Sequence, residues 1–347
     1  MITPRDYCMS SYLAFRYVID QSMEWAPGVM PVRPVPLKSN ALKVETAEDV
    51  KESLQILLKD TADGHTGILL SGGIDSAILA AMLPEGTRAY TIRFEAENFI
   101  DESQRAQEYA HARGFRHATV ETGWPDQVRH APFLMERKRS PLHAIEVALY
   151  KAALTAKEDG VTTLIVGNGA DSTFGGMDKL LSRDWTLEEF YKRYTYVDPL
   201  EVLRRPVDLH SVYAPYVRDG IIDTQGFLKT VHGTGVFQSF DNAIMAAGAA
   251  MCAPFERMRC ALPLDLGRIR SGDSKYLLRE LFRLLYPGFE VPEKIPFSRP
   301  MDSWLRNWKG PKRDEFRRDV RYSDMTGDQR WLLYCLEMFL EQLDSHG

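Results

Sequence analysis

Two glycine-rich stretches in this chain carry the residue types that bind nucleotide phosphates, and the first, at residues 71–76, reads Ser-Gly-Gly-Ile-Asp-Ser. Its glycines let the backbone approach an anion, its hydroxyls can bond phosphate oxygens, and the amides of a following helix would point at them. The carboxylate of Asp75 is a ligand type that Mg²⁺ prefers, although Asp75 could also be only a helix N-cap. The candidate phosphate-binding residues are Ser71, Gly72, Gly73 and Ser76.

The second stretch, residues 167–176, reads Gly-Asn-Gly-Ala-Asp-Ser-Thr-Phe-Gly-Gly and follows another apolar run. Gly167 and Gly169 would again admit an anion, and Asp171 would reach for the same metal ion as Asp75. Taken alone, each stretch is also compatible with an ordinary turn. The chain has no G-x-x-x-x-G-K-[ST] motif, which argues against transfer of the γ-phosphate.

The elements around these stretches alternate between strand and helix. This alternation predicts an α/β fold, a parallel sheet with helices on both faces, in which ligands bind beyond the carboxyl ends of the strands. Residues 71–76, 93–94 and 167–171 all lie at such ends. The expected strands are 66–70, 88–94, 116–121 and 162–167, and the expected helices are 46–59, 75–83, 101–113, 125–131 and 143–159.

Three regions are predicted: an N-terminal segment with a proline-rich linker (1–44), the ATP-binding core (45–180) and a mostly helical part that completes the substrate site (181–347). The small residues of 243–253 suit close helix packing, and an amphipathic helix near the C-terminus would pack on the body or on a partner subunit. The aromatic cluster Tyr191, Tyr194 and Tyr196 is either core or pocket lining. Interruptions of the helices are expected at Pro199, Pro206, Pro215, Gly233 and Gly235.

Composition is that of an ordinary enzyme. The 347 residues carry a net charge of −5, and 44% of them are hydrophobic, which gives no reason to expect nucleic acid and enough apolar side chain for a core. The sequence has neither a run of membrane-spanning length nor a signal-peptide pattern, so the cytoplasm is the expected location. The four cysteines show no metal-binding spacing.

Together, the two glycine-rich stretches resemble the synthetase domain of asparagine synthetase and its relatives, the β-lactam and carbapenam synthetases, among the PP-loop enzymes that split ATP between its α and β phosphates. Residues 89–94, 101–103, 274–279 and 294–304 agree with that resemblance, which covers about residues 45–310. It implies that Lys294 steadies the charge of an adenylated intermediate, although by position alone Lys294 could be a surface residue. It also implies ATP and Mg²⁺ as cofactors, an adenine site at the end of the strand that carries Ile92, Arg93 and Phe94, and Leu69 as a further ATP-binding residue.

Several positions depart from the family pattern. Residues 10–18 resemble the end of the family's glutaminase domain, yet position 2 is Ile2 where that domain needs a cysteine. The expected nitrogen source is therefore free ammonia, an amine or a separate nitrogen-donating partner. Asn168 stands where the family has an acid or a tyrosine, and an amide cannot act as a general base. Ala250 and Cys252 replace a Glu-x-Arg pair, which argues that the acceptor is not aspartate.

The sequence thus predicts a synthetase that adenylates a small-molecule carboxylate, releases pyrophosphate, and forms an amide as AMP departs. One alternative is a PP-loop sulfurtransferase that would carry a persulfide on Cys252 or Cys260. Another is a nucleotide-binding protein without catalysis, favoured only by Asn168. The acceptor acid, the nucleophile, the group that replaces the base, the kind of amide and a possible homo-oligomer stay open.

Overall fold

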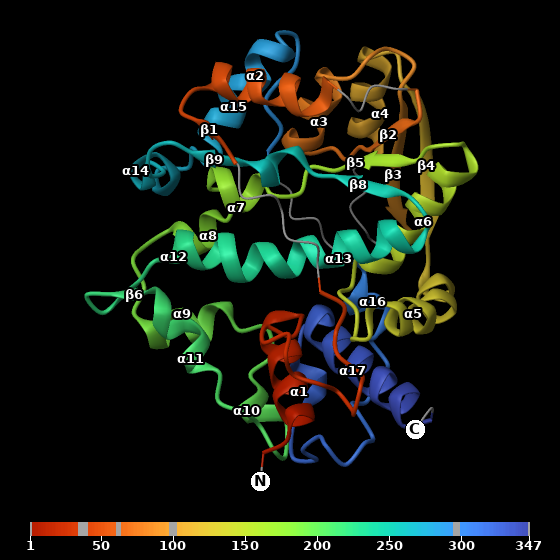
Figure 1. Cartoon of the computed structure of the whole chain (residues 1–347), viewed down its shortest axis with the longest axis vertical. Helices are drawn as coiled ribbons and strands as arrows, with labels where there is room; N and C mark the ends of the chain where they lie inside the picture. The colour runs from red at the N-terminus through yellow and green to blue at the C-terminus, as the bar shows by residue number, and fades with distance from the viewer. Residues whose placement is uncertain (1, 34–40, 60–63, 97–102, 294–298, 346–347) are drawn as a thin grey trace.

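The computed structural model describes residues 2–33, 41–59, 64–96, 103–293 and 299–345. Its centre is a five-stranded sheet in the order β4-β3-β2-β5-β8, in which every neighbouring pair is parallel (Figure 1). The predicted parallel α/β fold is confirmed. The strands are β2 (Thr66–Leu69), β3 (Arg88–Phe94), β4 (Arg116–Thr122), β5 (Thr163–Ile165) and β8 (Ala250–Cys252).

Helices cover both faces of this sheet because successive strand side chains point to opposite sides. Ile165 packs into one buried cluster, whereas its neighbours Leu164 and Val166 pack into another. The first cluster includes side chains of α2 (Ala47–Leu58), α3 (Ile74–Ala81), α4 (Ser103–Ala112) and α15 (Tyr276–Leu285). The second includes side chains of α6 (Glu146–Glu158) and α13 (Gly233–Ala246).

Local signals set several helix ends as the sequence predicted. The side chain of Thr46 accepts from the amide of Asp49, whose carboxylate bonds back to Thr46, so a capping box starts α2. Helix α5 (Trp124–Lys138) is longer than the expected 125–131, and it continues through Pro132 because Leu134 and Met135 are fully buried beyond the proline.

The region before the last strand differs from prediction in two ways. The expected breaks at Gly233 and Gly235 are wrong, because α12 (Thr224–Phe227) and the π-helix η3 (Leu228–His232) run straight into α13. A Cβ on Gly235 would lie 2.6 Å from the Tyr17 ring, so this glycine permits close packing. Residues 250–252, expected within a packed small-residue segment, form the edge strand β8.

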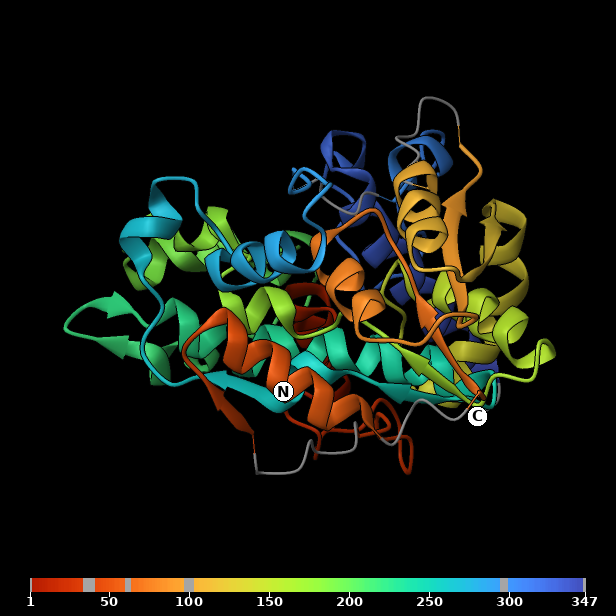
Figure 2. The same ribbon diagram turned by 90° about the horizontal axis from the view of Figure 1, so that it is seen from above.

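Shorter strands and helices connect these larger elements. Figure 2 shows β1 and β9 side by side as a separate parallel pair. The elements are β1 (Leu42–Val44), α7 (Ala170–Phe174), α8 (Asp178–Leu181), α9 (Leu187–Tyr194), α10 (Pro199–Val202), α11 (His210–Tyr213), η2 (Ala214–Tyr216), β6 (Val217–Arg218), β7 (Ile221–Ile222), η4 (Pro254–Arg257), β9 (Met258–Cys260) and α14 (Leu266–Arg270).

The two ends of the chain pack together below α13 in the view of Figure 1. There α1 (Pro4–Phe15) contacts α17 (Gly327–Ser345), with α16 (Met301–Trp304) and η5 (Tyr322–Asp324) preceding α17. The predicted amphipathic C-terminal helix is confirmed, and its apolar side chains lie in a buried cluster with Tyr12 and Leu13 of α1.

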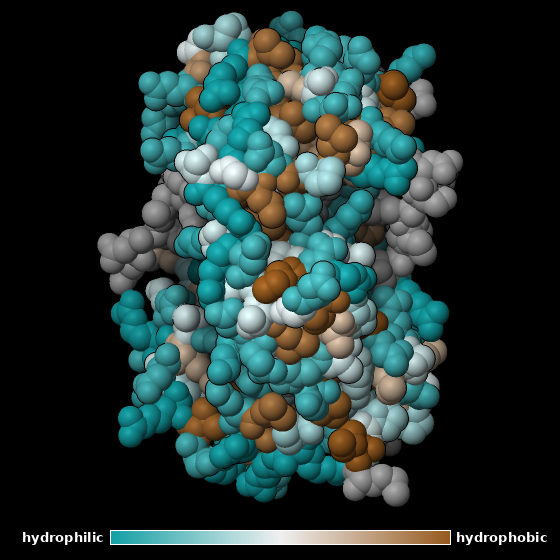
Figure 3. All heavy atoms as spheres, turned by 90° about the vertical axis from the view of Figure 1, so that its left-hand side faces the viewer, coloured by the Kyte–Doolittle hydropathy of each residue, from teal (hydrophilic) through white to brown (hydrophobic). Residues whose placement is uncertain are grey.

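The outer surface is mixed in character. The face shown in Figure 3 is mainly hydrophilic, with apolar residues in small groups and no single broad apolar patch on that face. Among the helices of the described residues, none is long and apolar enough to cross a membrane.

Candidate active site

The loop between β2 and α3 is held in shape by its own hydroxyls. The Ser71 amide donates to Ser76 Oγ at 3.0 Å, the two hydroxyl oxygens lie 2.9 Å apart, and the Gly73 amide donates to Ser71 Oγ at 3.2 Å. Gly73 is the N-cap residue of α3 and provides no side-chain cap. The loop is thus a tight turn at the carboxyl end of β2, with a helix N-terminus immediately behind it.

Two carboxylates from different loops meet at one cation beside this turn. Lys275 Nζ lies 2.6 Å from Asp75 Oδ2 and 2.8 Å from Asp171 Oδ1. Burial disfavours the ammonium, but the two carboxylates outweigh burial and raise the pKa of Lys275. Lys275 has a positive φ of 53° at the N-cap of α15, and only 6% of it is exposed. The predicted partners Asp75 and Asp171 therefore converge on a single cation-binding point.

The carboxylate pair fits a magnesium ion that is shared with phosphates. Within the described ranges, no group of three or more His, Cys, Asp or Glu side chains could hold a metal ion by itself. Mg²⁺ is commonly held by one or two carboxylates together with substrate phosphates. Because Lys275 stands where the two carboxylates meet, a metal ion there would need the ammonium to move toward another anion.

The second glycine-rich stretch packs tightly around these groups. A Cβ on Gly167 would lie 3.1 Å from the Cβ of Asp75, so the two predicted loops are in contact. Gly169 has φ of 91°, and a Cβ there would lie 2.7 Å from the backbone nitrogen of Glu256. Gly169 is therefore required by its left-handed backbone and by the approach of the Glu256 backbone, and Gly167 by the close approach of Asp75.

Glu256 places a carboxyl beside Asn168, the position where the family has an acid or a tyrosine. The amide Nδ2 of Asn168 donates to Glu256 Oε1 at 2.8 Å, and Asn168 is only 9% exposed. Burial raises the pKa of Glu256 to about 7, and Lys229 opposes this rise. Sequence reasoning missed Glu256 because it follows the Pro254-Phe255 pair, whereas the family pattern has its acid before that pair.

Lys275 was the other residue that sequence reasoning did not place in the site. It was noted only as part of residues 274–279, within a helix that resembles one of the family's. That resemblance was the available signal, since nothing in the spacing connects Lys275 with a loop 200 residues earlier.

The expected adenine edge lies at the end of β3. The Phe94 ring meets the Trp304 ring edge-on at 6.0 Å, and Trp304 Nε1 donates to the carbonyl of Glu95 at 3.3 Å. Arg93 is exposed and forms an ion pair with Glu121. Leu69 and Ile92 are half-buried at the same end of the sheet. Lys294, Asp101 and Glu102 lie outside the described residues.

The two cysteines considered for sulfur transfer have environments that disfavour a thiolate. Burial raises the pKa of Cys252 and of Cys260, while Arg257 and Lys229 respectively oppose the rise. The Cys260 thiol also donates to the carbonyl of Thr173 at 3.4 Å. A persulfide carrier needs a readily formed thiolate, so these environments do not favour that role.

A family of known proteins shares the part of the chain that contains both glycine-rich loops. A family model described as asparagine synthase matches residues 46–319. The chain belongs to the asparagine synthase family. The predicted resemblance is therefore confirmed, and with it membership of a family of ATP-dependent synthetases that use ammonia or an amine.

The likeness of this chain to one solved structure is distant, and the curated proteins provide no close relative. Among solved structures, the NMN synthetase from Francisella tularensis is 14% identical, covers 73% of this chain and 100% of its own, and has a TM-score of 0.29. A search of the curated proteins finds no match.

Proposed function

We propose that this member of the asparagine synthase family adenylates a small-molecule carboxylate and converts the adenylate to an amide with ammonia or an amine. The observation that supports this best is the meeting of Asp75, Asp171 and Lys275 between two glycine-rich loops. A cation-binding point beside such a turn suits a triphosphate with its metal ion, and the family resemblance implies the cut between the α and β phosphates.

In the first step, an acceptor carboxylate attacks the α-phosphorus of ATP and pyrophosphate leaves. The loop at residues 71–76 would hold the β and γ phosphates, and Asp75 and Asp171 would hold Mg²⁺. When bound, that ion would offset phosphate charge. Lys275 is already charged and buried beside both carboxylates, so its ammonium would turn to the departing pyrophosphate. Lys294 is proposed, from the family resemblance, to stabilise charge on the reacting groups.

In the second step, the lone pair of the amine attacks the acyl carbon, the bond from that carbon to AMP breaks, and AMP leaves with the electron pair. The nitrogen must lose a proton, and we assign its acceptance to the Glu256 carboxylate. A carboxyl with a pKa of about 7 is suited to accept a proton near neutral pH. Asn168 would hold this carboxylate in place through its amide hydrogen bond.

The competing functions have less support. The sulfurtransferase would need a thiolate from Cys252 or Cys260, and burial raises the pKa of both thiols. The non-catalytic alternative rested on the lack of a base at Asn168, and Glu256 supplies a carboxyl beside it. The pair of carboxylates is compatible with all three functions, whereas the buried carboxyl of raised pKa beside Asn168 favours proton transfer during amide formation.

The test is to incubate the protein with ATP, Mg²⁺, ammonium and fractionated cell extract, and to follow AMP and pyrophosphate. We expect AMP and pyrophosphate to form only in fractions that hold the acceptor, and to be lost in Asp75→Asn and Lys294→Ala. Asp314→Asn is the matched control because Asp314 is 89% exposed. Formation of ADP, or full activity in Asp75→Asn, would reject the proposal. Activity that disappears in Cys252→Ser would favour sulfur transfer.

A further inference from the structure

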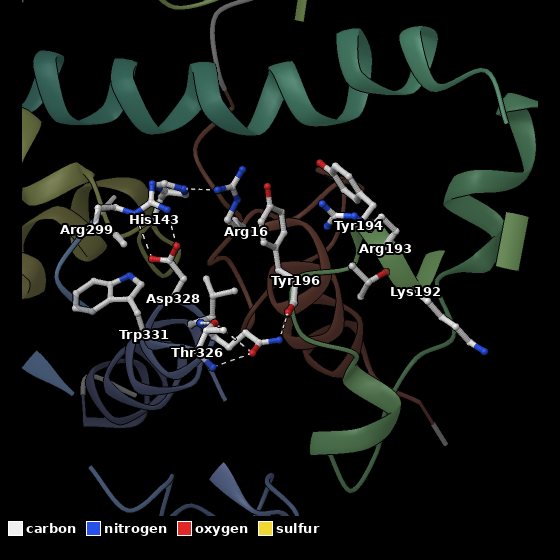
Figure 4. Close-up of a pocket in the computed structure, with 14 residues that line it drawn as sticks. Arg16, His143, Lys192, Arg193, Tyr194, Tyr196, Arg299, Thr326, Asp328 and Trp331 are labelled. Atoms are coloured by element: carbon white, nitrogen blue, oxygen red, sulfur yellow. Dashed lines mark hydrogen bonds and ion pairs between the residues drawn. The ribbon is translucent and has the colours of Figure 1, made fainter. Parts of the chain in front are cut away.

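A cavity of about 350 Å³ lies below α13, between the end of α1, α9 and the start of α17 (Figure 4). Its lining is rich in arginine: Arg16, Arg193 and Arg299 contribute guanidinium groups, and Asp328 contributes a carboxylate. Lys192 also belongs to the lining, but its side chain extends away from the other labelled residues in Figure 4. The lining of the cavity therefore carries a net positive charge.

Only part of this charge is neutralised within the protein. Arg299 is paired with Asp328, since its Nη2 lies 2.6 Å from Asp328 Oδ2. For Arg16 and Arg193, the described part of the chain provides no carboxylate partner. Cations held together in a half-enclosed space repel one another unless an anion joins them, so the arrangement favours an anionic ligand.

Arg16 is held in place by an uncharged partner. Its Nη1 lies 2.5 Å from His143 Nε2, while the amide of Ile145 donates to His143 Nδ1 at 3.3 Å. Burial and the nearby Arg16 keep the pKa of His143 well below its usual range, so the ring is neutral. A neutral imidazole has one acceptor nitrogen, yet both of its nitrogens face donors. An anion in the cavity would give the guanidinium an acceptor of its own.

The position of this guanidinium is fixed in advance. Arg16 has φ of 69° at the C-cap of α1, a left-handed conformation that is uncommon for a residue with a Cβ. Its guanidinium carbon lies 3.9 Å from the centre of the Tyr196 ring. A planar guanidinium stacked in this way presents its N–H groups edge-on, which matches carboxylate and phosphate oxygens.

Two segments that line the cavity also pack at the end of β3, the edge of the sheet where we place the nucleotide. Ala144 lines the cavity, and the next residue, Ile145, packs in the same buried cluster as Phe94 at the end of β3. On another wall, Arg299 precedes α16, whose Trp304 donates to the backbone of Glu95. The same two segments therefore contribute both to the wall of the cavity and to the packing at this end of the sheet.

We propose that this cavity binds an anionic group of the acceptor, a carboxylate or a phosphate distinct from the carboxylate that is adenylated. The inference rests on the proposed function and gives its substrate a second negative charge. Arg16 and Arg193 provide the charge, and Tyr196 holds Arg16 in position. Such an anchor would select acceptors by the separation between their two acidic groups.

Isothermal titration calorimetry with two probes, succinate and inorganic phosphate, tests this directly. We expect at least one probe to bind the wild type, and Arg16→Gln to weaken that binding about 10- to 100-fold, the effect of losing a hydrogen bond to a charged group. Arg317→Gln is the matched control, because that exposed arginine pairs with Asp319 outside the cavity. The stronger probe shows whether the group is a carboxylate or a phosphate.

A second variant and an ATP titration make the result decisive. Arg193→Gln should weaken the same probe, and ATP should bind both variants as it binds the wild type, which shows that they are folded. Binding that is equal in wild type and Arg16→Gln, or no binding of either probe at millimolar concentration, would overturn the inference. Arg16-dependent binding without AMP formation from any acceptor would reject the proposed function and leave the anion site supported.

Discussion

Replacement of Glu256 by glutamine should make the stability of the protein less sensitive to a rise in pH from 4.5 to 8. Burial raises the pKa of Glu256 to about 7 from an ordinary value of 4.5, so the folded protein binds this proton more tightly than the unfolded chain. The stability that this proton contributes is therefore fully present below pH 4.5 and is lost as the pH rises through 7. At higher pH, Glu256 causes no further change in stability. A difference of about 2.5 pH units corresponds to about 3 kcal/mol.

Glutamine has no proton to lose, so the variant avoids this loss. The quantity to compare is the free energy of unfolding of Glu256→Gln minus that of the wild type. We expect this difference to shift by up to about 3 kcal/mol in favour of the variant between pH 4.5 and pH 8. Urea unfolding at the two pH values measures it. Glu158→Gln, at an exposed position of α6, is the control and should behave as the wild type does. A difference between Glu256→Gln and wild type that stays the same at both pH values would refute the reasoning.

The same variant separates the two chemical steps. If Glu256 accepts the proton of the amine, amide formation in the wild type rises with pH through about 7. In Glu256→Gln, amide formation should fall about 10²- to 10⁴-fold, which is the usual contribution of a general base, and should lose the inflection near pH 7. Exchange of labelled pyrophosphate into ATP should continue, because adenylation needs no base here. Equal loss of exchange and amide formation would show that Glu256 is not specific to the second step.

Three further substitutions test buried contacts, two of them in the candidate active site. Lys275→Met leaves two carboxylates facing each other, so the free energy of unfolding should fall by about 3 kcal/mol and partly recover with Mg²⁺ in urea titrations. Glu146→Gln leaves the buried Lys138 ammonium without its charged partner, and should cost about 3–5 kcal/mol in the same assay. Gly169→Ala should cost more than about 1 kcal/mol because Glu256 blocks the added methyl group, whereas Gly28→Ala, at a similar φ with open space around it, should cost less.

Much of the nucleotide half of this protein follows from local sequence. Apolar runs and caps determined where the strands and helices of the sheet begin and end, as the Thr46 capping box shows. The pattern at residues 71–76 determined a tight turn between a strand and a helix, because a strand, two glycines and a helix start specify such a turn over a few residues. Asp75 and Asp171 were predicted to share a metal ion, and the fold brings their carboxylates to one point.

The tertiary structure alone decided what else reaches that point. Glu256 meets Asn168 across 88 residues, and Lys275 meets Asp75 across 200, distances over which sequence spacing carries no information. The helix that continues through Gly233 and the strand at residues 250–252 were decided in the same way, since packing and a free sheet edge outweigh weak local preference. Turns and helix starts depend on neighbours in the chain, whereas the charge and burial of a side chain depend on whatever folding places beside it.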